Sequence, residues 1–375
     1  MIDEAERLGG ELSWIARFTP ATRAAADALP RLDGERLLVT CHLDAKMVGY
    51  FAGVVAAGAQ VWACAANPLT TRDAVVDHLA GLGVRVTARF GDPTDRNAAA
   101  LHAALAAEPT LLVEMGADAS VAGNGRAPSV RGALEATGTG IDRLAALGLA
   151  YPVFDLDGLA LKQRLHNRHL VGLMAMTTFV ALTGLSLHSK RVLVVGYGPV
   201  GRGIADAARA FGAAVTVCDP DPTARLAAGY RGYPTSSLAA GLATSQVVLT
   251  ATGVDGAIRF EDLAACPDGV FLANLGHSNT ELPVDELRAH AVEVPRPGVE
   301  VCVVGGRVRY LLTGGAMLNL AGGPGDPYDT FDLITALLLD ATAFLATDGH
   351  RYPPGLHPLP ATVADRTARR VIGEA

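Results

Sequence analysis

Three glycines near the middle of the chain form the residue group with the clearest chemistry. Gly196, Gly198 and Gly201 have the spacing G-x-G-x-x-G and directly follow the apolar run Val192–Val195. In such a loop the first glycine permits a tight turn and the second lets the backbone approach a pyrophosphate. The third lets a helix pack closely on the strand. The pattern predicts a dinucleotide site.

Two flanking features support this interpretation. The helix is expected to begin at about Val200, directly after Pro199 of the glycine loop, so that its N-terminal amides and dipole face the phosphates. A second strand is predicted at 213–218, and Asp219 follows it at the distance the fingerprint requires. An acid there accepts hydrogen bonds from the adenosine ribose hydroxyls and repels a 2′-phosphate. The sequence therefore predicts NAD rather than NADP as the cofactor.

Alternating strands and helices are expected to position these residues. The predicted strands are Leu37–Cys41, Gln60–Cys64, Val84–Ala88, Leu111–Glu114, Val247–Thr250, Val270–Ala273 and Val308–Leu312. Such alternation is typical of parallel sheets covered by helices, so we expect an α/β fold with two doubly wound, Rossmann-like domains. The expected bounds are 1–169 for the first part of a substrate domain, 170–324 for the NAD domain and 325–375 for a segment returning to the substrate domain. A glycine- and threonine-rich connection is expected over 127–140.

Composition excludes several classes of partner. The 375 residues carry a net charge of −7, which leaves no basic face for nucleic acid or an anionic membrane. The five cysteines are scattered without a C-x-x-C pair, as in reduced, cytoplasmic proteins, and no metal site is predicted. The N-terminus lacks an apolar signal core. The apolar stretch 171–187 is short for a membrane span, so we expect a buried helix there.

Several further motifs occur in an order that resembles one family. They are Glu135–Gly140, Lys162 followed by Asn167, Gly196–Gly203, Leu275–His277, Leu318–Leu320 and Tyr352–Leu359. From residue 35 onward the chain resembles the S-adenosylhomocysteine hydrolases. In that family NAD oxidises a sugar 3′-hydroxyl, the ketone acidifies the 4′ C–H, the 5′ substituent is eliminated, water adds, and the hydride returns.

The resemblance implies roles for individual residues. Lys162 matches the base for the 3′-hydroxyl, since burial and the charge of NAD lower the pKa of a lysine. His42 and His277 match two histidines that move protons around the 5′ leaving group and water. The positions that match NAD contacts outside the glycine loop are Thr137, Thr139, Asn167, Asp219, Thr252, Gly276 and Asn319.

Other positions depart from the family pattern. Met115 stands where the family has an aspartate, and Ala136 stands where it has a glutamate. His166 replaces an aspartate, and Asp326 replaces a histidine. After His42, Asp44 and Lys46 replace a threonine and an acid. The family's C-terminal tail, which reaches a neighbouring subunit's NAD, is also expected to be missing. A homo-oligomer, dimer or tetramer, remains the expectation.

These departures favour a nucleoside substrate other than S-adenosylhomocysteine. We expect elimination of water to an exocyclic 4′,5′ alkene, as in the nucleoside dehydratase of angustmycin antibiotic biosynthesis. His166 or Asp118 would then remove the 4′ proton, and His277 or His42 would protonate the departing hydroxyl. The alternatives are true S-adenosylhomocysteine hydrolysis, a nucleoside 3′-oxidase or epimerase, and a non-catalytic NAD-binding regulatory paralogue.

Overall fold

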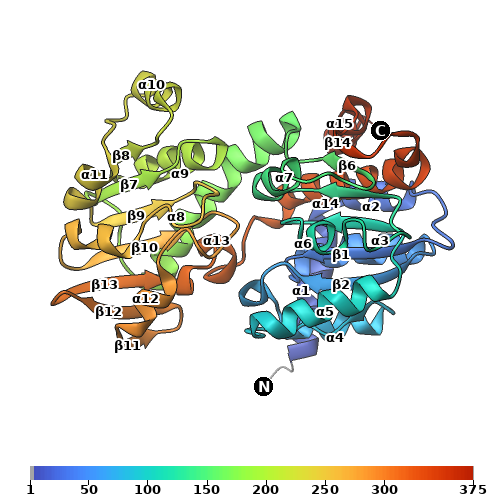
Figure 1. Cartoon of the computed structure of the whole chain (residues 1–375), viewed down its shortest axis with the longest axis horizontal. Helices are drawn as coiled ribbons and strands as arrows, with labels where there is room; N and C mark the ends of the chain where they lie inside the picture. The colour runs from blue at the N-terminus through green and yellow to red at the C-terminus, as the bar shows by residue number, and fades with distance from the viewer. Residues whose placement is uncertain (1–3, 375) are drawn as a thin grey trace. The chain divides into compact units, whose positions relative to one another are not determined.

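The chain forms two compact units in a computed structural model that describes residues 4–374. Unit 1 runs to Lys162 and resumes at Tyr328, and unit 2 is Gln163–Pro327 (Figure 1). The expected divisions were at 169/170 and 324/325, a few residues from those of the structure. Each unit contains one seven-stranded sheet covered by helices, so the α/β class with two Rossmann-like sheets is confirmed.

The sheet of unit 1 is parallel throughout. In spatial order its strands are β14 (Gly355–Pro358), β6 (Pro152–Asp155), β5 (Gly132–Glu135), β4 (Leu111–Glu114), β1 (Arg36–Cys41), β2 (Gln60–Ala65) and β3 (Arg85–Val86). Its helices are α1 (Glu4–Phe18), α2 (Pro20–Asp27), α3 (Val48–Ala56), α4 (Asp73–Gly81), α5 (Thr94–Ala106), α6 (Asp118–Gly123), α7 (Gly138–Ala145), α14 (Tyr328–Thr347) and α15 (Ala361–Val371).

The sequence-based prediction differs from this sheet in three ways. The connection expected over 127–140 contains β5, and neither β6 nor β14 was expected. Each of these strands is short and contains a glycine or a proline, residues that are depleted in strands, so none reads as a strand in the sequence. The strand expected over 84–88 is reduced to two residues at the sheet edge.

The apolar helix α14 anchors the returning segment in unit 1. Its buried residues include Ile334, Leu337 and Leu338, which share one core cluster with Leu37 and Val39 of β1. Within residues 4–374, α14 is the one helix long and apolar enough to cross a membrane, and 67% of its most apolar window is buried inside the protein. The stretch thus serves as a core helix of unit 1.

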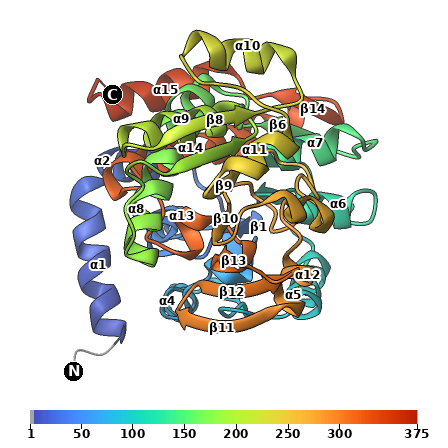
Figure 2. The same cartoon turned by 90° about the vertical axis from the view of Figure 1, so that its left-hand side faces the viewer.

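The sheet of unit 2 is mixed. Its strands in spatial order are β11 (Ala291–Arg296), β12 (Val299–Val304), β13 (Arg307–Leu312), β10 (Val270–Asn274), β9 (Val247–Thr250), β7 (Arg191–Val195) and β8 (Ala214–Cys218). Its helices are the π-helix Leu161–Leu170, which begins in unit 1, α8 (Val171–Thr183), α9 (Pro199–Ala210), α10 (Pro222–Tyr230), α11 (Leu238–Thr244), α12 (Val284–Ala289) and α13 (Leu318–Ala321). Figure 2 shows the strands running from β8, near α10, to the edge strand β11.

Both sheets have a point where the strand order reverses. In unit 1 the neighbours of β1 are β2 and β4, and in unit 2 the neighbours of β7 are β8 and β9. Ligands of open α/β sheets bind in the crevice at the carboxyl ends of such strands. The residues that follow β1 and β4, and those that follow β7 and β9, are therefore the candidates for the site.

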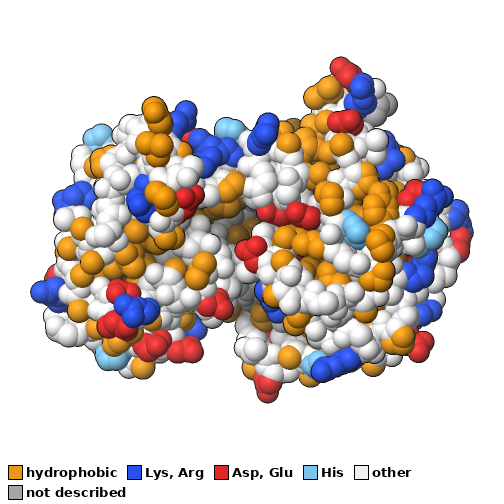
Figure 3. Space-filling view, turned by 45° about the horizontal axis from the view of Figure 1, so that its top comes forward, with side chains coloured by type: hydrophobic (Ala, Val, Ile, Leu, Met, Phe, Trp, Pro, Cys, Tyr) orange, Lys and Arg blue, Asp and Glu red, His pale blue; other side chains and the backbone are white. Residues whose placement is uncertain are grey.

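Charge is mixed on the face shown in Figure 3, where basic side chains are interspersed with acidic and apolar ones.

Candidate active site

The glycine loop of unit 2 has the geometry that the fingerprint requires. Gly196 has φ +95°, and a Cβ placed there would lie 2.4 Å from the carbonyl oxygen of Ala251. A Cβ on Gly201 would lie 2.0 Å from the carbonyl oxygen of Gly196. By contrast, a Cβ on Gly198, the residue before α9, would meet nothing within 4 Å. Two glycines are therefore required by the fold, and the third leaves open space beside the helix N-terminus.

Asp219 is held at the end of β8 by the loop that it faces. Its Oδ2 accepts a 2.6 Å hydrogen bond from the Tyr197 amide, and its Oδ1 accepts one of 2.8 Å from the Asp221 amide. Arg225 of α10 donates to the carbonyl oxygens of Asp219 and Pro220. The acid is thus fixed beside the glycine loop, where the ribose of a dinucleotide lies in this fold.

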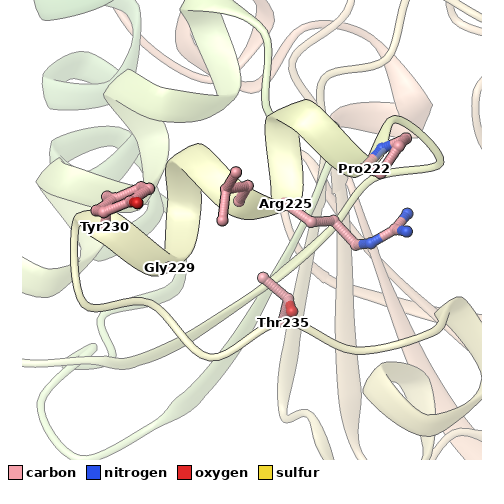
Figure 4. A pocket seen from close by; sticks show the side chains of 6 residues that line it. Pro222, Arg225, Gly229, Tyr230 and Thr235 are labelled. Atoms are coloured by element: carbon pink, nitrogen blue, oxygen red, sulfur yellow. The ribbon is translucent and has the colours of Figure 1, made fainter.

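A shallow pocket of about 490 Å³ lies along α10 beside this acid. Figure 4 shows Pro222 and Tyr230 at its two ends, with Arg225 between them and Thr235 on the following loop. Arg225, which lines the pocket, also donates to the backbone carbonyl oxygen of Asp219.

The loops after β9 and β10 are joined by one buried carboxylate that the sequence analysis missed. Glu281 is fully buried and accepts hydrogen bonds from the Thr252 hydroxyl (2.8 Å) and the Gly253 amide (2.7 Å). A Cβ on Gly276 would lie 1.7 Å from the same carboxylate. The positions of Thr252 and Gly276, both expected NAD contacts, therefore depend on Glu281. No local sequence motif distinguishes Glu281 from the other glutamates of the chain.

Asn274, at the end of β10, organises the His277 loop. Its side-chain amide donates to the carbonyl oxygens of Gly276, Ser278 and Gly315, and its Oδ1 accepts from the Gly276 amide. His277 is half-buried in this loop. In the sequence, the feature that points to Asn274 is its position directly after the predicted strand Val270–Ala273.

Asn319 supplies a direct observation in favour of a bound cofactor. The residue is 1% exposed on α13, and its Oδ1 has no hydrogen-bond partner among residues 4–374. An unsatisfied buried carbonyl oxygen costs about 1–3 kcal/mol, so a donor on a ligand would relieve it. Together with the glycine loop and Asp219, this residue fits NAD.

His166 and Asp326, two departures from the family pattern, are in contact. His166 Nε2 lies 2.7 Å from Asp326 Oδ2, and its Nδ1 lies 2.9 Å from Asn167 Oδ1. The three side chains are buried, with exposed fractions of 6%, 4% and 8% for His166, Asp326 and Asn167. The imidazole is therefore fixed at both ring nitrogens within unit 2.

His42, at the end of β1 in unit 1, has a defined proton arrangement. Its Nδ1 lies 2.7 Å from Thr70 Oγ, and the Thr70 hydroxyl donates to the carbonyl oxygen of Asn67 at 2.8 Å. Because the hydroxyl proton is used on Asn67, Thr70 accepts from His42, whose Nδ1 carries a proton. In the neutral ring Nε2 is then the nitrogen that takes up a proton, as an acid–base residue requires.

Two buried glutamates end β4 and β5. Glu114 accepts hydrogen bonds from the Ser120 hydroxyl and from the amides of Ala119 and Ser120. Glu135 Oε1 accepts from the Gly116 amide and from the Thr137 amide and hydroxyl. Burial raises the pKa of Glu114 to about 7 and that of Glu135 to about 8, with Glu114 adding to the latter. Both carboxyl groups thus titrate near neutrality.

The expected residues around these glutamates are exposed to different degrees. Asp118 forms a half-exposed ion pair with Arg143 at 2.7 Å. The Thr137 hydroxyl accepts a 3.0 Å hydrogen bond from the Gly140 amide and so caps the N-terminus of α7 in this structure. Thr139 lies half-buried in the first turn of α7. Ala136 is 3% exposed.

A buried ion pair follows His42 where the family has uncharged and acidic residues. Lys46 Nζ lies 2.7 Å from Asp44 Oδ2, and their side chains are 5% and 14% exposed. The ammonium group also lies 5.6 Å from the Phe331 ring centre. A buried lysine brings hydrogen-bond donors to the carboxyl edge of β1.

The predicted site residues thus fall into two groups. Within unit 1 the structure brings His42, Asp118, Thr137 and Thr139 to the carboxyl edge of its sheet, with Lys162 at the unit's boundary. Within unit 2 it brings the glycine loop, Asp219, Thr252, Gly276 and His277 to the corresponding edge, with Asn319 in the helix that follows. Their proposed roles stay predictions.

Comparison with known proteins identifies the family. Residues 173–325 match the model for the S-adenosyl-L-homocysteine hydrolase NAD-binding domain. Adenosylhomocysteinase of Thermococcus kodakarensis is 34% identical over 96% of this chain and 89% of its own length. S-inosyl-L-homocysteine hydrolase of Methanopyrus kandleri is 34% identical over 95% and 88%. With this identity over almost the whole length and a site that fits NAD as cofactor, the chain belongs to the S-adenosylhomocysteine hydrolase family.

Proposed function

We propose that this protein is an NAD-dependent nucleoside dehydratase that acts by transient 3′-oxidation and elimination at the sugar 5′ position. The observation that carries the proposal is a contrast between the cofactor residues and the other site residues. The glycine loop and Asp219 lie in the segment that matches the family's NAD-binding domain, whereas the departures are Met115, Ala136 and the buried Lys46–Asp44 pair in unit 1 and the His166–Asp326 pair in unit 2. Loss of a carboxylate that pairs with ribose hydroxyls costs about 1–3 kcal/mol per group, which disfavours the family's usual substrate.

Bound NAD supplies one chemical capacity, the acceptance and later return of the 3′ hydride. In the proposal Lys162 takes the 3′-hydroxyl proton and His166 takes the 4′ proton. The electrons of the 4′ C–H bond are first delocalised into the 3′ ketone and then form the 4′,5′ double bond as the 5′ C–O bond breaks. His42 or His277 gives a proton to the leaving hydroxyl, so that water departs.

Two observations favour His166 over Asp118 as the base. Asp118 is engaged with Arg143 in a half-exposed ion pair. His166 is buried and held by hydrogen bonds on both sides.

Product analysis tests the proposal against its alternatives. The protein with NAD is given S-adenosylhomocysteine in one experiment and a panel of nucleosides with free 5′-hydroxyls in another, and products are followed by mass. The proposal predicts loss of one water from a nucleoside. Release of homocysteine would instead assign true hydrolysis, which the curated relatives favour. Oxidation without water loss would indicate a 3′-oxidase or epimerase, and no reaction would favour a regulatory paralogue.

A further inference from the structure

The contact between His166 and Asp326 determines which nitrogen of the His166 ring can gain or lose a proton. An ionised carboxylate accepts hydrogen bonds but donates none. Because Asp326 Oδ2 lies 2.7 Å from Nε2, that nitrogen carries a proton in both the neutral and the cationic ring. Nδ1 is then the nitrogen that gains or loses a proton.

Asn167 completes the arrangement on the other side of the ring. Its Oδ1 lies 2.9 Å from His166 Nδ1, which is the geometry of an N–H donating to an amide oxygen. With both nitrogens facing acceptors, the observed arrangement is that of the protonated ring, so Nδ1 accepts a proton only when the Asn167 side chain is turned away from it. The amide oxygen of Asn167 would hold the accepted proton.

We propose that Asp326 is a positioning residue: it holds the Nε2 proton of His166, so that Nδ1 takes the 4′ proton of the sugar and Asn167 holds it afterwards. This inference rests on the proposed function. The step balances, because the 4′ C–H bond breaks, its proton goes to Nδ1, and its electron pair is delocalised into the 3′ ketone.

Asp326→Asn tests the inference with little change in shape. The first readout is NMR of the protein with ¹⁵N-labelled histidine and requires no substrate. Wild type should show His166 protonated at Nε2, and the variant should lose this preference for Nε2. A wild-type neutral ring protonated at Nδ1, or an unchanged tautomer in the variant, would overturn the inference.

The second readout separates two partial reactions in heavy water, using a panel nucleoside that the wild type dehydrates. Oxidation at 3′ is followed by NADH absorbance, and removal of the 4′ proton by deuterium incorporation. Asp326→Asn should lower deuterium incorporation by about a hundredfold and leave NADH formation within about threefold of wild type. Equal losses in both would indicate a structural role and contradict the inference.

Asp340→Asn is the matched control. Asp340, on α14, is 3% exposed and thus buried like Asp326. Its carboxylate forms an ion pair with Arg366 and accepts a hydrogen bond from Thr367, both on α15. This variant should lower stability without changing the ratio of the two partial reactions. If the wild type itself forms no NADH with any nucleoside, the proposed function fails, whereas the NMR result still decides the role of Asp326.

Discussion

The Tyr197 amide donates a 2.6 Å hydrogen bond to Asp219, so the glycine loop after β7 and the acid after β8 are one connected structure. This link means that a substitution at Asp219 affects both the ribose site and the loop. A conservative change that removes only the charge is therefore the informative one.

Asp219→Asn should shift cofactor preference from NAD toward NADP. The amide retains one acceptor oxygen for the Tyr197 amide, but it no longer repels a 2′-phosphate. The ratio of NADP to NAD affinity should rise about tenfold, which corresponds to about 1.4 kcal/mol. Isothermal titration of both cofactors measures this ratio. Asp221→Asn, which changes the cap of α10, is the control and should leave the ratio unchanged.

Two alanine substitutions in the glycine loop should have different effects. Gly201→Ala places a Cβ 2.0 Å from a carbonyl oxygen, so it should lower the free energy of unfolding by about 1–3 kcal/mol or more. Gly198→Ala meets nothing within 4 Å, so it should fold normally yet bind NAD weakly because a pyrophosphate needs that space. Thermal unfolding and NAD titration separate the two results. Equal stabilities would contradict the assigned geometry.

Glu281→Gln should loosen the loops after β9 and β10. One side-chain oxygen becomes an NH₂ group that faces the Thr252 or Gly253 amide, so a buried hydrogen bond is replaced by two opposed donors. The cost should be about 1–3 kcal/mol of stability, with weaker NAD binding. Glu300→Gln, which breaks a partly exposed ion pair with Arg288, should cost less than about 1 kcal/mol. Chemical denaturation compares both variants with wild type.

Glu135 should make stability depend on pH near neutrality. Its folded pKa of about 8 lies above its ordinary value, so the folded state binds more protons than the unfolded state between these values. The contribution of Glu135 is therefore fully present at low pH and is lost as pH rises toward about 8. Glu135→Gln does not ionise, so its stability relative to wild type should rise from about pH 5 to about pH 8 and stay level above that. A constant difference over this range would show that Glu135 is already ionised.

Sequence reasoning found the parts of the site that depend on local spacing. The turn at Gly196, the helix that follows it and the acid at Asp219 lie along a short stretch of chain. The helix, expected from about Val200, begins at Pro199, and Asp219 lies beside the glycine loop. His166 and Asp326 lie 160 residues apart, so their two departures from the family pattern seemed independent. Their contact follows from the packing of unit 2, which no local pattern encodes.

The short strands and Glu281 were missed for a related reason. β5, β6 and β14 have four residues each, and only their neighbours in the sheet make them strands. Glu281 lies in a loop and acquires its role by reaching the backbone after β9, about 30 residues earlier in the chain. Tertiary packing determines such positions.

The central claim is transient oxidation of the sugar by bound NAD. It is tested most directly by mixing the NAD-loaded protein with a nucleoside that it dehydrates and following cofactor absorbance during one turnover. The account predicts that NADH rises and then decays as the dehydrated product appears, and that Lys162→Met abolishes the rise. Product formation with no change in cofactor absorbance would contradict it.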